Sequence, residues 1–367
     1  MKKVPEQAFD PSELKEDIDP SPRVRKLVAD NNRLSRRIDE LKLQLGHQEE
    51  FFLEVTGAVD RLQPSESKTK EIPEKERKVD NPMSAVLVLG DWHIGEVIDA
   101  DVIEGINVFD WDIARSRIKH LTTKFMDWVE VGRKTGVIDE AVIVVVGDLI
   151  SGDIHEELKA TNEFPVPEQT VRSGYLLSEA VATIASGFER VRVEFMSADN
   201  HSRLSKKYQF KQGGWNSYNY IVGWIARERL SNLENVEFNL YQALKELIQV
   251  RNHKYLCMHG HTIKGWSGFP WYGAERQVSR EAQVRMMLEN KEFDKMIIGH
   301  FHVPLNASKF IVNGSLTGTN ELDHGVGRSG SPCQVAWLVH PKYGETNWTA
   351  FWVEFGDNTD AGDFAKL

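Results

Sequence analysis

From about residue 83 onward, short apolar runs alternate with amphipathic stretches, and this alternation determines the expected fold. Strands are predicted where apolar residues stand together, at Ala85–Leu89, Ala141–Val146, Val191–Met196, Tyr255–Met258 and Lys295–Ile298. Helices are predicted where apolar side chains recur every three or four residues, over about 112–134, 168–189, 217–231 and 274–290. Strands that alternate with helices predict an α/β sheet with helical layers on its faces.

The C-terminal part has a different pattern. Segments 308–313 and 334–354 read as strands with no helix between them. We therefore expect this strand-rich tail to form a second sheet that packs on the first.

An unbroken heptad pattern occupies residues 23–62. Positions spaced alternately three and four apart form a narrow, largely apolar stripe between charged residues, made of Val24, Leu27, Asn31, Leu34, Ile38, Leu41, Leu45, Gln48, Phe52, Val55, Val59 and Leu62. Asn31 falls at an a position, where a buried amide fixes register and favours two strands. We predict a helix that forms a homo-oligomer through a coiled coil; the alternative is a single amphipathic helix that lies on the main domain.

These patterns divide the chain into four parts. Residues 1–22 are polar, contain prolines and are expected to be a disordered tail. The coiled-coil helix spans 23–62, and a charged, proline-bounded linker covers 63–82. The globular domain occupies 83–367.

Composition narrows the class of protein. Among the 367 residues there are two cysteines, which is too few for a disulfide framework. No apolar run is long enough to cross a membrane, and no signal core follows the N-terminus, so we expect a cytoplasmic protein. The formal charge of −10 argues against nonspecific coating of nucleic acid. It leaves room for a nuclease, because bound metals neutralise phosphate locally.

Five clusters of Asp, Asn and His follow the predicted strands. They read Asp91-Trp-His93, Gly147-Asp148, Asn200-His201, His259-Gly-His261 and Gly299-His300-Phe-His302. Residues two apart in extended chain point the same way, and sites in α/β sheets lie at the carboxyl ends of strands. A lone Asp in such a place is usually a turn or cap, and a lone His is usually surface or core. The ordered set of five predicts ligands for two divalent metals, which are suited to hydrolysing phosphate esters.

The ordered set resembles the calcineurin-like metallophosphoesterase superfamily, whose pattern is Asp-x-His, Gly-Asp, Gly-Asn-His-Asp/Glu, His and Gly-His-x-His. The resemblance covers about residues 84–355, and Asn313-Gly-Ser315 looks like the strand-turn that follows the last motif in many members. It implies a four-layer α/β/β/α sandwich, here with an N-terminal coiled-coil helix added.

The resemblance also implies residue roles and cofactors. Two divalent ions are expected, with Mn²⁺ preferred and Fe or Zn²⁺ as alternatives. The first would be held by Asp91, His93, Asp148 and His302, and the second by Asp148, Asn200, His259 and His300. Asp148 would then bridge the two ions. His259 is preferred to His261 because it directly follows a predicted strand. His201 would be the acid that protonates the leaving oxygen.

Two departures from the resembled pattern concern His201. The third motif reads Asp199-Asn-His-Ser202, so Asp replaces Gly and Ser replaces a carboxylate. The position three residues after Asp148, which often orients the catalytic His, is Ser151. We expect Asp153 to act with His201 in catalysis, with His155 as the alternative.

The choice of phosphate ester rests on two segments that follow the site motifs. Arg203, Lys206 and Lys207 come directly after His201 and are the expected substrate contacts. Nearby aromatics, including Tyr208 and Trp215, and a second basic and aromatic stretch over 262–280 suit a nucleic acid substrate; a solvated face above a core helix is the alternative. The chain also resembles bacteriophage-encoded phosphoesterases and, more distantly, SbcD-type repair nucleases.

Three hypotheses follow from these features. The first is a metal-dependent DNA or nucleic-acid phosphodiesterase, and thus a nuclease. The second is a phosphatase or phosphodiesterase for small nucleotides or phosphoproteins. The third is a non-enzymatic coiled-coil assembly protein with an inactive domain.

Overall fold

The structure is a computed structural model, and it describes residues 26, 29–36, 38–39, 42, 81–264, 268–354 and 361–367. The chain divides into two units, Met1–Gly57 and Ala58–Leu367. Within the first unit the described residues are helical and exposed, including Asn31, Leu34 and Ile38 of the heptad stripe. The rest of the stripe, the predicted tail 1–22 and the predicted linker up to residue 80 lie outside the described residues, so the coiled coil stays a prediction.

The first sheet of the second unit has the order β11-β10-β1-β2-β3-β4. Strands β1 to β4 are parallel, whereas β10 runs antiparallel to both β1 and β11. The six strands are β1 Met83–Leu89, β2 Ile138–Val145, β3 Arg190–Met196, β4 Val236–Tyr241, β10 Cys333–His340 and β11 Gly344–Trp352.

The second sheet has the order β5-β6-β7-β9-β8. Its central strands β6, β7 and β9 are parallel, and the edge strands β5 and β8 are antiparallel to their neighbours. The five strands are β5 Glu246–Val250, β6 His253–Met258, β7 Lys295–Ile298, β8 Leu305–Asn306 and β9 Phe310–Val312.

The expected second sheet in the C-terminal tail is therefore only partly right. The segment around 308–313 does lie in the second sheet as β9, but 334–354 forms the hairpin β10–β11 and extends the first sheet beside β1. The reason is that β10 has two apolar faces. Trp337 packs in the core between the sheets, while Ala336 and Leu338 pack on the opposite face, as in a strand buried inside a large layered sheet.

Side-chain alternation along the strands builds the layers. Val86 and Val88 of β1 point into the core between the two sheets, and the intervening residues point to the outer face. Full burial of one such side chain stabilises the fold by about 1.5–3 kcal/mol. The described residues of this unit form six helices, α2 Trp111–Arg133, α3 Glu156–Thr161, α4 Val166–Ala185, α5 Tyr218–Arg229, α6 Trp271–Arg285 and α7 Glu321–Gly325.

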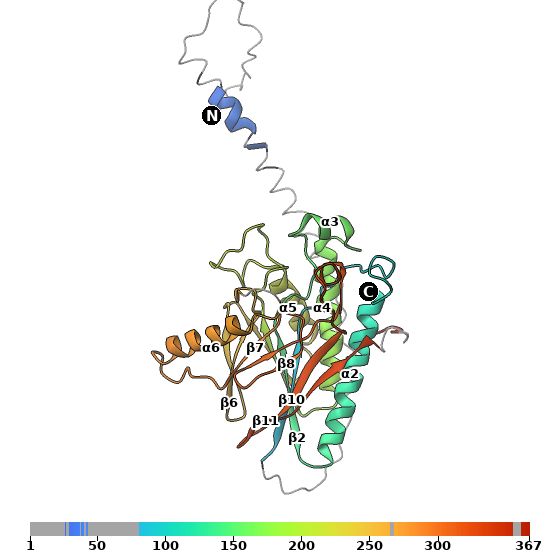
Figure 1. Cartoon of the computed structure of the whole chain (residues 1–367), viewed down its shortest axis with the longest axis vertical. Coiled ribbons are helices and arrows are strands. Elements are labelled where there is room, and N and C mark those ends of the chain that lie inside the picture. The colour runs from blue at the N-terminus through green and yellow to red at the C-terminus, as the bar shows by residue number, and fades with distance from the viewer. Residues whose placement is uncertain are drawn as a thin grey trace, which may run out of the picture. The chain divides into compact units, whose positions relative to one another are not determined.

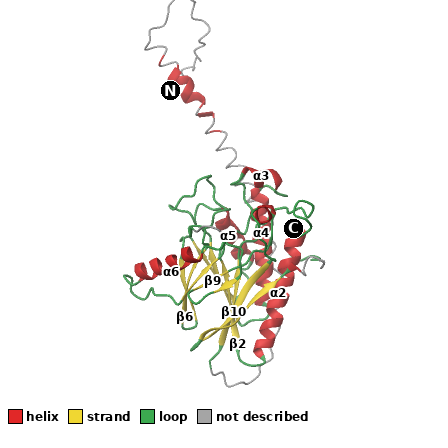
Figure 2. Cartoon of the chain, in the orientation of Figure 1, coloured by secondary structure: helices red, strands yellow, loops and turns green. Residues whose placement is uncertain are grey.

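Helices cover the outer faces of both sheets. Residues of α2, α4 and α5 pack on the outer face of the first sheet, and α6 contributes Ala274 to the core on the outer face of the second. Figure 1 shows α2 and α4 on one side of the strands and α6 on the other, and Figure 2 shows the strands between them. This is the predicted four-layer α/β/β/α sandwich. None of the helices among the described residues is both apolar enough and long enough to span a lipid bilayer.

Candidate metal centre

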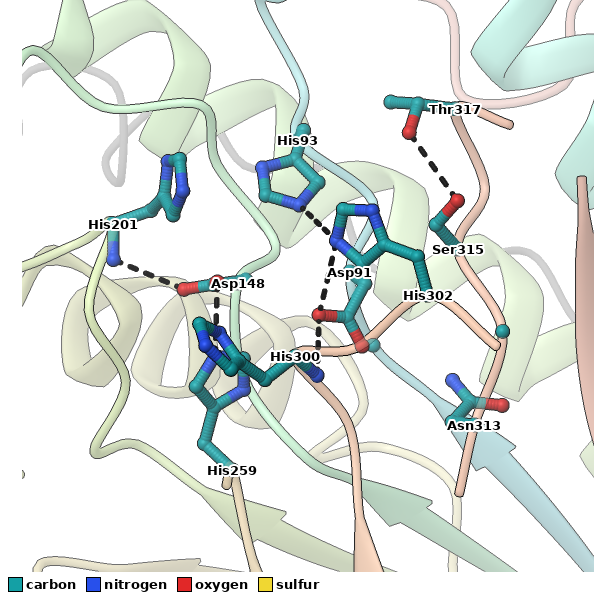
Figure 3. A network of polar contacts seen from close by, with 12 residues as sticks. Asp91, His93, Asp148, His201, His259, His300, His302, Asn313, Ser315 and Thr317 are labelled. Atoms are coloured by element: carbon teal, nitrogen blue, oxygen red, sulfur yellow. Dashed lines mark hydrogen bonds and ion pairs between the residues drawn. The ribbon is translucent and has the colours of Figure 1, made fainter. Parts of the chain in front are cut away.

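The five Asp, Asn and His clusters converge at one place. Each follows a strand, namely β1, β2 and β3 of the first sheet and β6 and β7 of the second. Because the carboxyl ends of these parallel strands lie at the same edge of their sheets, residues from distant parts of the chain meet there. Figure 3 shows the side chains of one member or more from each cluster gathered there, namely Asp91, His93, Asp148, His201, His259, His300 and His302.

The first grouping consists of Asp91, His93 and His302, whose ligand atoms all lie within 4.8 Å of one another. The Nε2 atoms of His93 and His302 are 3.1 Å apart, and His302 Nε2 is 3.6 Å from Asp91 Oδ1. Asp91 Oδ2 is buried and has no hydrogen-bond partner among the described residues. A buried carboxylate oxygen without a donor beside two facing imidazole nitrogens fits a divalent cation.

The second grouping consists of Asp148, His259 and His300. His259 Nε2 lies 2.9 Å from Asp148 Oδ2 and 2.9 Å from the side-chain oxygen of Asn200. The other ring nitrogen, Nδ1, is 2.8 Å from the carbonyl oxygen of Val146. Since a carbonyl oxygen can only accept a hydrogen bond, Nδ1 carries a hydrogen. Nε2 is then the ring nitrogen that faces Asp148 and Asn200 and could bind a metal.

Asp148 joins the two groupings. Its ligand atom also lies within 4.8 Å of those of His93 and His201, and its Oδ1 accepts a hydrogen bond of 3.0 Å from the backbone amide of His201. Figure 3 shows the Asp148 carboxylate between His201 and His259. This central place is the one that the predicted bridging ligand would need.

The ring of His201 is oriented by main chain. Its Nδ1 lies 2.7 Å from the carbonyl oxygen of Ser151. A Cβ added at Gly152 would come within 2.2 Å of the His201 carbonyl oxygen, so the two loops touch. The side-chain oxygen of Gln169, which is fully buried, accepts from the Gly152 amide at 2.8 Å. The loop that holds the imidazole is thus itself anchored on α4.

Backbone conformation marks the same residues. Five of the predicted ligands have positive φ angles between 48° and 69°, namely Asp91, His93, Asp148, His300 and His302. For residues other than glycine this left-handed conformation costs about 1–3 kcal/mol each. Strain concentrated on a set of converging ligand side chains is typical of a functional site, where the surrounding fold holds an unfavourable geometry.

Charges in the centre shift several pKa values. Burial disfavours a charged His259, but the neighbouring Asp148, Asp91 and Asp199 carboxylates raise the pKa of His259 to about 10. Burial and the positive charge of His259 lower the pKa of His300 to about 2. Burial, with the charges of His201 and His302, also lowers the pKa of His93. Without metal, His259 is therefore an imidazolium at neutral pH, with a proton on Nε2 as well as on Nδ1, whereas His300 is neutral.

The arrangement agrees with a known family. The model of the family "Calcineurin-like phosphoesterase" matches residues 84–326 of this chain. The chain belongs to the calcineurin-like phosphoesterases. Members of this superfamily hydrolyse phosphoesters with divalent metals, and the groupings described above are candidate ligand clusters for such ions.

Several solved structures are similar to this chain. Vps29 from Entamoeba histolytica, complexed with Zn²⁺, has 15% sequence identity and a TM-score of 0.28, over 74% of this chain and 99% of Vps29. A purple acid phosphatase from yellow lupin has 9% identity and a TM-score of 0.27, over 76% of this chain and 55% of its own. A serine/threonine phosphatase from Saccharomyces cerevisiae has 12% identity and a TM-score of 0.25, over 83% of this chain and 89% of its own. No curated protein sequence matches the chain.

The other predicted site residues are placed as follows. His261 packs beside His259 and His300 but belongs to none of the ligand groupings. Asp153 and His155 are exposed, and the His155 ring lies 6.2 Å from that of His201. No hydrogen bond joins Asp153 to His201 among the described residues, so its catalytic role stays a prediction.

The predicted substrate contacts lie on the segment that follows His201. The Arg203 guanidinium donates to the carbonyl oxygens of Asn200, Ser205 and Lys206, and so holds the segment from within. Lys206 forms an exposed ion pair of 2.6 Å with Glu156, and Lys207 is exposed. Of the second basic and aromatic stretch, Trp266 lies outside the described residues.

Sequence reasoning missed the residues that support the ligands. Gln334 on β10 accepts from the Gly90 amide at 2.9 Å and lies 3.2 Å from the side-chain nitrogen of Asn313, and so ties together two loops beneath the centre. Gln169 anchors the loop beside His201. A single Gln in a strand or helix produces no periodic pattern in the sequence. The carbonyl of Ser151 produces no sequence signal either, because every residue has a backbone carbonyl.

Proposed function

We propose that this calcineurin-like phosphoesterase is a dinuclear metal phosphodiesterase that cleaves nucleic acid, with single-stranded DNA as the substrate to test first. The observation that carries the choice of substrate is a surface of exposed aromatic and basic side chains on the segment between His201 and α5. The metal groupings support the hydrolytic chemistry.

Two divalent ions fit the donor set. The first would be held by Asp91, His93, His302 and Asp148, and the second by Asp148, Asn200, His259 and His300. Mixed carboxylate, amide and imidazole donors suit Mn²⁺, Fe or Zn²⁺ better than Ca²⁺, and we propose Mn²⁺. When bound, such a pair supplies charge neutralisation at the phosphoryl group and an activated water for attack in line with the leaving oxygen.

His201 is the proposed acid. Its Nδ1–H donates to the Ser151 carbonyl, so Nε2 is the atom that gains and gives a proton. In the imidazolium form His201 gives the Nε2 proton to the leaving oxygen as the P–O bond breaks. The carbonyl of Ser151 holds the ring at a fixed angle through the hydrogen bond at Nδ1.

The segment after His201 offers stacking surfaces. It leaves the centre at Arg203 and returns to Ser217, which is bridged to Arg203. Phe210 is 66% exposed and Trp215 is 53% exposed, and Trp215 stacks on Tyr220 with ring centroids 5.3 Å apart. Exposed rings beside exposed lysines are what unstacked bases and their phosphates require. A compact phosphate monoester without a base would not stack on these rings.

The substrate choice is tested with Trp215→Ala. The matched control is Tyr343→Ala, because Tyr343 is 70% exposed, stacks on His340 with centroids 4.7 Å apart, and lies in the β10–β11 turn at the opposite end of the first sheet. Loss of one stacked base costs about 1–3 kcal/mol. We expect Trp215→Ala to lower kcat/KM for a labelled single-stranded oligonucleotide by about 5- to 150-fold, and to leave hydrolysis of bis(p-nitrophenyl) phosphate unchanged.

Two results would count against nucleic acid as the substrate. One is equal loss in Trp215→Ala and Tyr343→Ala. The other is Mn²⁺-dependent turnover of nucleotides or p-nitrophenyl phosphate far above that of the oligonucleotide, which would favour the alternative of a small-molecule or phosphoprotein phosphatase.

A further inference from the structure

Asp199 is a buried carboxylate in the centre that belongs to none of the ligand groupings. It follows β3 and directly precedes Asn200 and His201, and only 2% of it is exposed. Its Oδ2 accepts from the backbone amide of Asp148 at 2.9 Å, and its Oδ1 accepts from the amide of Ser202 at 3.0 Å and from the Ser202 hydroxyl. One carboxylate thus joins the loop after β2 to the loop after β3.

The connection continues to α5. Ser202 Oγ lies 2.6 Å from Ser217 Oγ, and Ser217 is the N-cap of α5, where it accepts from the Asn219 amide at 3.1 Å. The Tyr218 amide also donates to the Ser202 carbonyl at 2.9 Å. The turn that carries Asn200 and His201 is therefore fixed on one side to Asp148 and on the other to a helix terminus.

The neighbouring backbone leaves room for this carboxylate. Gly147 has a φ of 101°, and a Cβ added there would lie 2.8 Å from the Cβ of Asp199 and 3.1 Å from Nδ1 of His259. Asp199 itself has no positive φ. The Asp that replaces the Gly of the resembled motif therefore has an ordinary backbone conformation, and the positive φ is at Gly147.

We propose that Asp199 is a positioning residue that sets the distance between Asp148 and the Asn200–His201 turn. In this chain the motif carries its carboxylate at the first position and a hydroxyl at the fourth, and the two side chains contact each other. The inference rests on the proposed function, because it assumes that Asp148 and Asn200 hold a divalent ion.

Asp199→Asn tests this role with little change of shape. An amide has one oxygen, so it can accept from the Asp148 amide or from the Ser202 amide, but its nitrogen must face the other donor. The matched control is Glu194→Gln, since Glu194 is another buried carboxylate on β3, bonded to Arg192 and Tyr241 and not to the metal loops.

Mn²⁺ binding to the full chain, measured by calorimetry and by electron paramagnetic resonance, is the primary readout. We expect Asp199→Asn to weaken binding of the second ion by about 10- to 100-fold, as loss of a group that orients ligands does, and Glu194→Gln to bind as the wild type does. With substrate, kcat should fall in Asp199→Asn while KM stays close to the wild-type value. Wild-type Mn²⁺ affinity in folded Asp199→Asn would overturn the proposal.

Ser202→Ala gives a second test if Asp199→Asn does not fold. It removes the hydroxyl contact to Asp199 and the link to Ser217 but keeps the bond from Asp199 to the Asp148 amide. We expect both ions to bind and kcat to fall by a smaller factor than in His201→Ala; unchanged kcat in Ser202→Ala would overturn the role of the link. Because Mn²⁺ binding is measured without substrate, a wild type that binds two ions but does not cleave DNA would refute the proposed substrate and leave this test intact.

Discussion

The two ends of the first sheet both carry clusters of charged side chains, and they differ in how those charges are paired. At the amino end, a cavity of about 570 Å³ is lined by Asp139, Glu140, Glu189, Arg190, Arg192, Gln249 and Arg251. Each arginine there has a carboxylate partner; Arg192, for example, contacts Glu140 and Glu194 at 3.0 Å and 2.8 Å. The charged side chains at this end are therefore paired with one another.

At the carboxyl end the pairing is incomplete, although His259 contacts Asp148 and His302 contacts Asp91. The imidazoles of His93 and His302 face each other, Asp91 Oδ2 has no donor within the part of the chain that the structure describes, and all three residues have positive φ. A polar cluster whose groups are satisfied stabilises a fold. A buried cluster whose groups are unsatisfied and strained needs a ligand, and here the donor atoms suit metal ions.

The largest effect is expected at the shared ligand. Asp148→Ala removes the side chain that is proposed to bind both ions, so we expect loss of bound metal and a fall of activity to the metal-free background. Added Mn²⁺ should raise the Tm of the wild type, because an ion that binds only the folded chain stabilises it, and should leave the Tm of Asp148→Ala unchanged. Metal analysis and thermal melts measure both; an equal Tm increase in the variant would remove Asp148 from the centre.

A smaller effect is expected at the proposed acid. His201→Ala should keep both metal ions and lower kcat by about 10²- to 10⁴-fold, the usual contribution of a general acid. The loss should shrink for substrates with a good leaving group, such as bis(p-nitrophenyl) phosphate, because these need less protonation. A variant that loses metal together with activity would instead make His201 a ligand.

Substitutions at the amino end of the first sheet should lower the stability of the protein and leave its activity unchanged. Glu140→Ala removes one of the two carboxylate partners of Arg192 and the acceptor of the Ser84 hydroxyl, so we expect a loss of about 1–3 kcal/mol in the free energy of unfolding. Its control is Glu237→Ala, an exposed pair with Arg190 worth about 0–1 kcal/mol. Denaturant unfolding measures both. If Glu140→Ala impaired metal binding, the two ends would not be independent.

The smallest effect is a pH dependence of metal affinity. Because carboxylates raise the pKa of His259 to about 10 in the metal-free protein, the second ion must displace a proton at neutral pH. Its apparent affinity should rise with pH, by up to about tenfold per pH unit below the pKa of His259, and level off above it. His300 should release no proton when the ion binds, because its pKa is about 2 and it is already neutral. Calorimetry in buffers of different ionisation enthalpy counts the released protons; an affinity independent of pH would contradict this assignment.

The sequence predicted the parts of the structure that repeat a pattern. Strand runs such as Val86–Leu89 and the motifs that follow them located the sandwich and its centre, because apolar alternation and strand-end placement are local signals. The position of β10 and β11 was not predictable in this way, since a strand with two apolar faces fits the edge of either sheet. The edge strands β4 and β5 were missed; both are short, mix apolar with polar residues and are largely half-buried.

Within the centre, the sequence named the groups that converge but not the contacts that orient them. Ligand types and their order were visible in the motifs. The carbonyl of Ser151 that orients His201, and the carboxylate of Asp199 that joins two loops, depend on distances across the fold. Such contacts leave no trace in spacing or composition.

Anomalous X-ray diffraction from crystals of the full chain grown with Mn²⁺ tests the central claim most directly. We expect two anomalous peaks, one among Asp91, His93 and His302 and one among Asp148, His259 and His300, with Asp148 adjoining both. No peak at either grouping, or manganese bound only elsewhere on the chain, would contradict the account.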